Sequence, residues 1–297
     1  MPEIGNKIPK ADIDLIDGTF NISQSKSYHL SIQIETDRLS FCVFNTVIHK
    51  FVILRSYPLP VICPSLATVH SSLIDACRPI FENDDLIRLS YQSSRLLWIS
   101  PRYTLVPEQL FDPDEADSYL SFNQGVATDE HTLHRYIRPA NSYQVFSCPA
   151  ELINLACMYQ PDISFFHHSV PFIQSVVTGV PPSYKADVAI YFHFRWLDVA
   201  VIKNEKLLFY NSFKINAPAD SLYYLAGVSN LFDIDLLSTK LMYAGSLNKT
   251  PPEIEILKGY VGSITECEPP NRVAYSHHIT EPFRRNFINL FNLYGCE

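Results

Sequence analysis

Three clusters of histidine stand out, because histidine is the side chain best suited to binding a metal or moving a proton near neutral pH. The clusters are His131 with His134, His167 with His168, and His277 with His278. Adjacent strand residues point to opposite faces of a sheet, so His167 and His168 are not expected to bind one ion together. No histidine pair has a carboxylate at a familiar ligand spacing, and HExxH is absent. We therefore expect no metal site.

Carboxylates and nucleophiles give no clear sign of an active site either. The densest acidic patch is Asp112-Pro113-Asp114-Glu115 with Asp117. A helix is predicted to begin there, and negative charge complements the positive end of a helix dipole. The chain has no GxSxG motif and no recognisable cysteine signature. No catalytic residue is assigned, and a hydrolase using a histidine or carboxylate cluster is kept as one alternative.

Glycine, which phosphate-binding loops require, is scarce at 9 of 297 residues. The nine are Gly5, Gly18, Gly125, Gly179, Gly227, Gly245, Gly259, Gly262 and Gly295. No two are separated by a single residue, so the chain contains no GxG. This excludes the Rossmann fingerprint, the P-loop and the kinase glycine-rich loop, because their backbone amides must approach phosphate without an obstructing Cβ. No cofactor is expected.

Composition limits the class of partner and the compartment. The net charge is −8, so binding to a nucleic-acid backbone is disfavoured. No apolar run reaches the roughly 18 residues of a membrane span, and no signal-peptide pattern is found at residues 1–10. The seven cysteines are odd in number and never spaced as CxxC. We expect a reduced, cytoplasmic protein without a membrane span.

Hydrophobic periodicity predicts the elements that would position any site. Leu30, Ile32 and Ile34 alternate with polar residues, which is typical of a half-buried strand. Strands are expected at 28–34, 39–43 and 51–54, followed by a helix at 65–81. The same order recurs about 160 residues later, with strands at 187–194, 197–201 and 207–210, a helix from 218–220, and a strand at 241–244.

The remaining sequence patterns predict further helices and strands in the two halves of the chain. We expect helices at 113–122, 149–159 and 168–178, strands at 131–137 and 143–147, and a final helix capped by Thr280. Thr178-Gly179-Val180-Pro181-Pro182 is the predicted hinge. The predicted domains are an irregular arm at 1–27, a first lobe at 28–178 and a second lobe at 187–297. The fold class is α/β with two similar lobes, each starting with a three-strand antiparallel meander.

This duplicated order resembles the actin-like ATPase superfamily, a two-lobed class that includes actin and hexokinase. Parts of the amino-acid sequence are similar to an uncharacterised bacterial group, domain-of-unknown-function family 3822. The similar stretches are YHLSIQIETDRLSFCVF (28–44), YTLVPEQLFDPDEADSYLSFN (103–123) and LYYLAGVSNLFDIDLLSTKLMYAGSL (222–247). The resemblance implies a duplicated two-lobed actin-like (ribonuclease-H-like) fold. The family has no established activity.

The resemblance also implies what the first hairpin of each lobe should carry. In active members of the class these hairpins hold an acidic residue and glycines that approach the nucleotide phosphates. Here the turns read Glu35-Thr36-Asp37-Arg38 and His193-Phe194-Arg195-Trp196, and neither contains glycine. The resemblance therefore implies the scaffold of an ATPase without its phosphate loops, a pseudo-ATPase.

The resulting functional hypothesis is a non-catalytic actin-like protein that acts as a protein-binding or scaffold module. Some actin-like relatives in pilus assembly bind a peptide in the cleft between the lobes. By that resemblance Arg195 and Trp196 are the predicted partner-binding residues, for a protein or peptide partner, with a homodimer as an open alternative. The competing hypothesis is a diverged ATP-binding phosphotransferase or ATPase of the same class.

Overall fold

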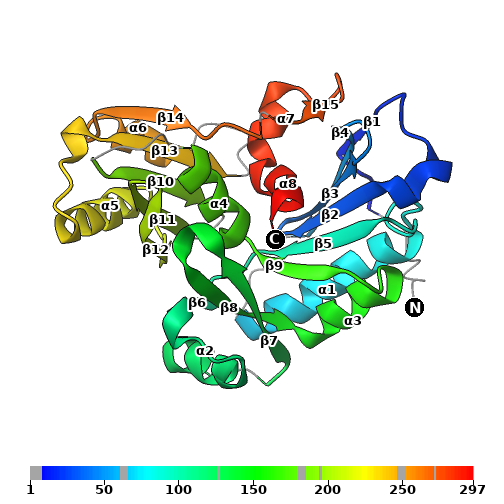
Figure 1. The fold of residues 1–297 in the computed structure, drawn as a ribbon, viewed down its shortest axis with the longest axis horizontal. Helices are drawn as coiled ribbons and strands as arrows, with labels where there is room; N and C mark the ends of the chain where they lie inside the picture. The colour runs from blue at the N-terminus through cyan, green and yellow to red at the C-terminus, as the bar shows by residue number, and fades with distance from the viewer. Residues whose placement is uncertain are drawn as a thin grey trace.

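The first sheet contains the predicted meander and is larger than expected. The computed structural model describes residues 9–60, 66–125, 128–179, 185–193, 196–245, 252–270 and 272–296, with backbone alone for 66–70. The antiparallel strands β2 (Tyr28–Ile34), β3 (Arg38–Asn45) and β4 (Lys50–Pro58) pair in sequence order. Two parallel strands, β5 (Ser93–Trp98) and β9 (Ser164–His167), extend the sheet beyond β2 (Figure 1).

The segment expected as an irregular arm is partly ordered into this sheet. Strand β1 (Ile13–Ile16) pairs antiparallel with β4, and the short β15 (Ala274–Tyr275) also pairs with β4. The backbone groups of an edge strand attract any extended segment that can pair with them. The sequence pattern missed β1 because four residues are too few to show a clear alternation.

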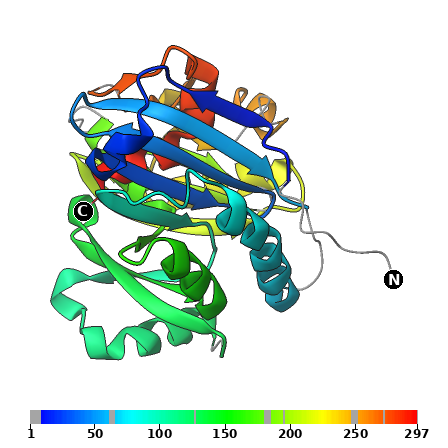
Figure 2. The ribbon, with the colours of Figure 1, turned by 90° about the vertical axis from the view of Figure 1, so that its right-hand side faces the viewer.

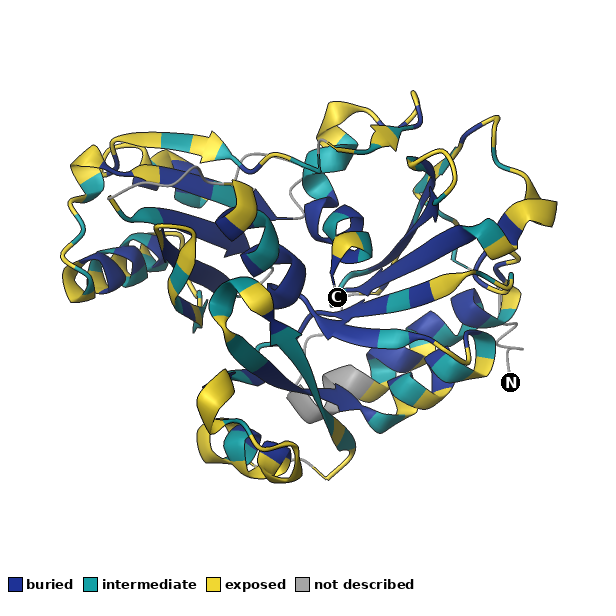
Figure 3. Cartoon of the chain, viewed as in Figure 1, coloured by how far each residue is buried: buried dark blue, intermediate teal, exposed yellow. Residues whose placement is uncertain are grey.

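Both faces of the first sheet are covered, which corrects the prediction of a half-buried strand at 28–34. All seven residues of β2 are buried. One face packs with α1 (Leu66–Asn83) and α3 (Ala150–Tyr159), through side chains such as Ile80 and Leu152. The other face packs with α8 (Ile288–Asn292), whose Leu290 and Phe291 share a buried cluster with Cys42 and Phe44 of β3. Figure 3 shows β2 and β3, in the middle of this sheet, as almost entirely buried.

A small separate unit is inserted between β5 and β9. It comprises β6 (Tyr103–Pro107), α2 (Ala116–Gln124), β7 (Glu130–Ile137) and β8 (Ser142–Pro149). The three strands form an antiparallel sheet in the order β6-β8-β7, and α2 packs on it through Ala116 and Leu120. This unit projects from the first sheet (Figures 1 and 2). The helix and two of the strands were predicted from the sequence, but their separation into a sheet of their own was not.

The second lobe repeats the meander. Its sheet has the order β12-β11-β10-β13-β14. The strands are β10 (Asp187–Phe192), β11 (Trp196–Lys203), β12 (Lys206–Lys214), β13 (Lys240–Gly245) and β14 (Ser263–Glu266). One face packs with α5 (Ala219–Leu231) and α6 (Pro252–Leu257). The other face lies against α4 (Ser169–Gly179), where Phe172 contacts the rings of Tyr191 and Tyr210.

The end of the chain returns to the first lobe. The predicted final helix is split at Phe287 into α7 (Glu281–Asn286) and α8. Thr280 occupies the N-cap position of α7, but its side chain makes no capping hydrogen bond, which corrects that part of the prediction. The Arg95 guanidinium donates to the carbonyl oxygens of Leu293 and Tyr294 and so holds the helical turn that follows α8 against β5. The predicted hinge lies partly outside the described residues, since 180–184 are not among them.

Candidate functional site

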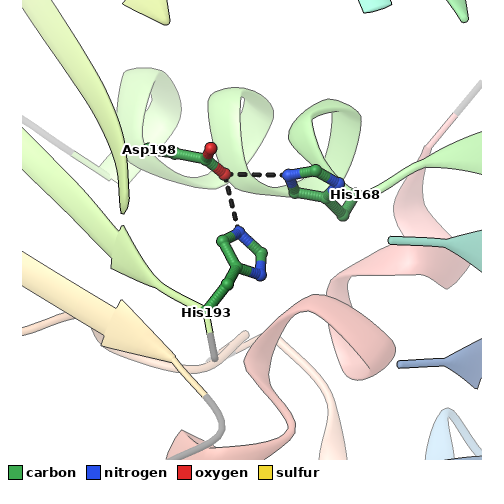
Figure 4. Close-up of side chains that lie close together, drawn as sticks. All are labelled: His168, His193 and Asp198. Atoms are coloured by element: carbon green, nitrogen blue, oxygen red, sulfur yellow. Dashed lines mark hydrogen bonds and ion pairs between the residues drawn. The ribbon is translucent and has the colours of Figure 1, made fainter. Parts of the chain in front are cut away.

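A buried carboxylate between the two lobes is the centre of the candidate site. Asp198 is part of β11, and one of its oxygens, Oδ2, lies 2.8 Å from Nε2 of His168 and 2.8 Å from Nε2 of His193. His168 precedes α4 on the first-lobe side, while His193 follows β10 in the second lobe. The side chains of His168 and Asp198 are 0% exposed and that of His193 is 3% exposed. Figure 4 shows both imidazoles directed at the same carboxylate.

The second carboxylate oxygen of Asp198 is held from the neighbouring strand. Ser212 of β12 is paired with Asp198 in the sheet register, and its hydroxyl donates to Oδ1 of Asp198. The Ser212 and Tyr103 hydroxyl oxygens are 3.2 Å apart. A serine hydroxyl has one proton, so Tyr103 is the donor in this second bond. Asp198 is thus fixed by three donors, and Tyr103 links the cluster to the small inserted sheet.

The surroundings keep Asp198 ionised. Burial by itself raises the pKa of its carboxyl, but His193 and His168 outweigh burial and hold that pKa well below its usual range. Burial lowers the pKa of His168, although the nearby Asp198 acts in the opposite direction. The lobe contact therefore encloses a carboxylate whose negative charge is stabilised by imidazole N–H groups. Among the described residues no lysine or arginine pairs with Asp198.

His167 belongs to a different network from its neighbour His168. Its Nε2 lies 2.6 Å from the Ser100 carbonyl oxygen, and its Nδ1 lies 2.7 Å from the side-chain nitrogen of Gln144. Burial, and then the proximity of His168, lower the pKa of His167 well below its usual value. The two histidines bind different partners although their ring centroids are only 4.1 Å apart, because β9 ends at His167 and His168 lies in the turn before α4.

The hairpin at the start of the first lobe carries a second perturbed carboxyl. Burial, and then the neighbouring Asp37, raise the pKa of Glu35 from 4.5 to about 7. The side-chain nitrogen of Gln33 donates to Glu35. Burial, followed by the charges of Glu35 and Asp198, raises the pKa of Tyr191 well above its usual value.

The structure describes one of the two residues predicted to bind a partner. Trp196 begins β11, and its indole stacks on His193 with ring centroids 4.9 Å apart. The indole nitrogen of Trp196 is buried and has no hydrogen-bond partner among the described residues. Arg195 lies outside the described residues. Partner binding by Arg195 and Trp196 stays a prediction.

The sequence analysis missed the cluster of His168, His193 and Asp198. His168 and Asp198 are 30 positions apart, so no motif of fixed spacing joins them. One signal was present: Asp198 interrupts the apolar run from Leu197 to Ile202. A charged residue in the middle of a buried strand needs a partner, and that requirement points to an ion pair or a bound cation.

The other histidine and carboxylate groups do not form a common site in the described part of the chain. His134 packs beside Phe111, with ring centroids 5.0 Å apart. His277 and His278 are exposed, and their tilted rings have centroids 3.7 Å apart. The Asp112 carboxylate accepts from the backbone N–H of Asp114, which confirms its interpretation as a residue at a helix start.

Two cavities lie away from the hairpins. One, of about 460 Å³, lies between β12 and α5 and is lined by aromatic rings that include Phe209, Phe213 and Tyr223. The other, of about 280 Å³, lies beside α2 and is lined by Arg102 and Glu130 among others. Among the described helices none is long and apolar enough to cross a membrane.

Comparison with known proteins agrees with this architecture. The chain is similar to a protein from Bacteroides thetaiotaomicron that has an actin-like ATPase fold and unknown function. The identity is 20%, the TM-score is 0.79, and the match covers 94% of this chain and 100% of that one. It is also similar to a chain of the PilM-PilN type IV pilus biogenesis complex, with 12% identity, a TM-score of 0.59 and coverage of 91% and 98%.

The family is fixed by sequence. No curated protein matches the chain. The profile of the family described as "Protein of unknown function (DUF3822)" matches residues 17–264, which is most of the 297 residues. The chain therefore has the actin-like ATPase fold and belongs to the DUF3822 family.

Proposed function

We propose that this chain is a non-catalytic actin-like protein that needs no bound nucleotide and acts as a protein-binding or scaffold module. The proposal rests mainly on one observation. The two hairpins that would hold a nucleotide's phosphates present side chains where such loops need free backbone amides. Each hairpin contributes differently.

In the first hairpin, Glu35 occupies the turn after β2. Its carboxyl is in surroundings that raise its pKa to about 7, so a negative charge there is already disfavoured. A phosphate group nearby would add further negative charge to the same poorly hydrated place. The turn also has no glycine to let a phosphate approach the backbone.

In the second hairpin, the His193 imidazole is already engaged. Nε2 of His193 is directed at Asp198, and the indole of Trp196 covers the His193 ring. The ionised Asp198 would repel an incoming phosphate. These contacts favour a closed arrangement in which protein side chains occupy the region between the hairpins.

A protein or peptide is the partner that we propose for this scaffold. Support comes from the similarity to a chain of the PilM-PilN complex, since that complex joins two kinds of protein. We place the partner at Arg195 and Trp196, with a homodimer as the alternative. We also propose a cytoplasmic location.

Isothermal calorimetry with Mg-ATP and Mg-ADP at up to millimolar concentration tests the first half of the proposal. We expect no binding heat and no change in melting temperature. A dissociation constant below about 100 μM, which corresponds to about −5.5 kcal/mol, would contradict it. The competing ATPase or phosphotransferase hypothesis would then be favoured.

Affinity capture with matched variants tests the second half. The double variant Arg195→Ala/Trp196→Ala should lose the partner that the wild-type chain retains. Tyr223→Ala, which removes a side chain 75% exposed on α5, is the control and should retain it. Equal recovery of the partner by the double variant and the wild type would show that the partner binds elsewhere.

A further inference from the structure

We propose that His168, His193 and Asp198 form a binding site for a divalent transition metal of the zinc class, which joins the first lobe to the second. The three ligand atoms lie within 4.8 Å of one another. Two imidazoles and one carboxylate are a ligand set that zinc accepts in three-ligand sites. The inference is independent of the proposed function.

The ligands come from separate parts of the fold. His168 is at the junction between β9 and α4, His193 follows β10, and Asp198 is within β11. Only the packing of α4 against the second sheet brings His168 to the other two. A metal bound here would therefore connect the end of the first-lobe sheet to the first hairpin of the second lobe.

The carboxylate is oriented as a metal ligand usually is. Oδ1 of Asp198 is held by the Ser212 hydroxyl, and Ser212 is within hydrogen-bond distance of Tyr103. This leaves Oδ2 directed at both imidazoles. Outer hydrogen bonds of this kind fix the orientation of a ligating carboxylate.

The site needs only a small adjustment to accept an ion. Zinc–nitrogen and zinc–oxygen distances are about 2.0–2.2 Å, so ligand atoms around a tetrahedral ion lie about 3.3 Å apart. The nitrogen–oxygen distances here are 2.8 Å, because each imidazole bonds directly to the carboxylate. Opening each contact by about 0.5 Å, by rotation of side chains, makes the space.

The hydrogen bonds that the ligand side chains make away from the metal also limit the affinity for the metal. Nδ1 of His168 is buried and has no hydrogen-bond partner among the described residues, so this ligand lacks the usual outer support. Loss of such a partner typically weakens metal binding by about 10- to 100-fold. With three protein ligands and one imidazole that lacks an outer partner, we expect weaker binding than at a four-ligand structural site.

The test is a zinc titration of the full chain without an affinity tag, at pH 7.5, against a chromophoric chelator. We expect one site per chain. His193→Gln should weaken it at least about 100-fold, since a ligand is lost rather than its outer partner. His278→Gln is the matched control: it removes an exposed histidine outside the cluster and should leave the affinity unchanged.

Two further measurements keep the outcome clear. Cobalt substitution should give the visible absorption of a four- or five-coordinate ion in the wild type and lose it in His193→Gln. Circular dichroism without metal shows whether His193→Gln and His278→Gln are folded. The proposal would be overturned if the wild type bound zinc with a dissociation constant above about 100 μM, or if the wild type and His193→Gln bound zinc equally well. The cluster would then be held by hydrogen bonds alone.

Discussion

Buried histidines are the residues through which this protein should respond to pH. His29 of β2 is 1% exposed, and its ring nitrogens lie 2.7 Å from the Ser93 hydroxyl and 3.1 Å from the Ser31 hydroxyl. Burial, and then the Arg95 charge, lower the pKa of His29 from 6.5 to about 3. The pKa values of His167 and His168 are lowered as well. All three therefore favour the neutral form in the folded chain.

The sign of the pH effect follows from proton binding. Between pH 6.5 and 3 the unfolded chain binds a proton at His29 and the folded chain does not, so the free energy of unfolding falls as the pH is lowered. His29 alone should remove about 2 kcal/mol between pH 7 and pH 5. Urea unfolding at both pH values measures this, and His29→Gln should reduce the loss by about that amount. An unchanged loss in the variant would contradict the assignment.

At the scale of elements, two glycines illustrate opposite constraints on the backbone of the second lobe. A Cβ at Gly262, which directly precedes β14, would lie 2.6 Å from the Leu237 carbonyl oxygen, so part of the backbone would have to move. Gly262 also donates its N–H to the Leu236 carbonyl oxygen at 2.8 Å. Gly227 is inside α5, and a Cβ there meets no atom within 4 Å.

The same substitution should therefore have opposite effects at the two positions. Gly262→Ala should lower the free energy of unfolding by about 1–3 kcal/mol, since a close contact must be relieved. Gly227→Ala should raise it by about 0.5–1 kcal/mol, because alanine favours the helix. Urea denaturation of both variants measures the difference. If Gly262→Ala were as stable as the wild type, the close approach of Leu237 would be wrong.

For the whole molecule, α8 and α4 connect the two lobes. Phe291 of α8 is 1% exposed and packs on Phe51 of the first sheet, with ring centroids 4.8 Å apart. Asn289 of α8 donates to the His168 carbonyl oxygen at 3.3 Å, beside the start of α4. Helix α4 in turn contacts the second sheet through Phe172. This continuous packing suggests that both lobes unfold together.

Each lobe contains one of the two tryptophans, Trp98 in β5 and Trp196 in β11. Phe291→Ala should cost about 3–5 kcal/mol, the usual result of emptying a buried aromatic site. Each tryptophan can be followed alone in a chain that lacks the other one, made by Trp98→Phe or by Trp196→Phe. In both chains, Phe291→Ala should shift the midpoint of urea unfolding, measured by tryptophan fluorescence, by the same amount. The exposed Tyr223→Ala should shift neither. A shift confined to the Trp98 reporter would show that the lobes unfold separately.

Local sequence patterns determine some parts of this structure, and the packing of distant segments determines others. The sequence determined both meanders, most helices and the absence of glycine phosphate loops, because side-chain periodicity and glycine spacing act over a few residues. It also indicated the family, through stretches such as residues 28–44. The tertiary structure alone decided that both faces of β2 are buried, since α8 arrives from more than 250 positions away. It alone brought His168 to Asp198, because that contact depends on how α4 packs between two lobes rather than on any spacing along the chain.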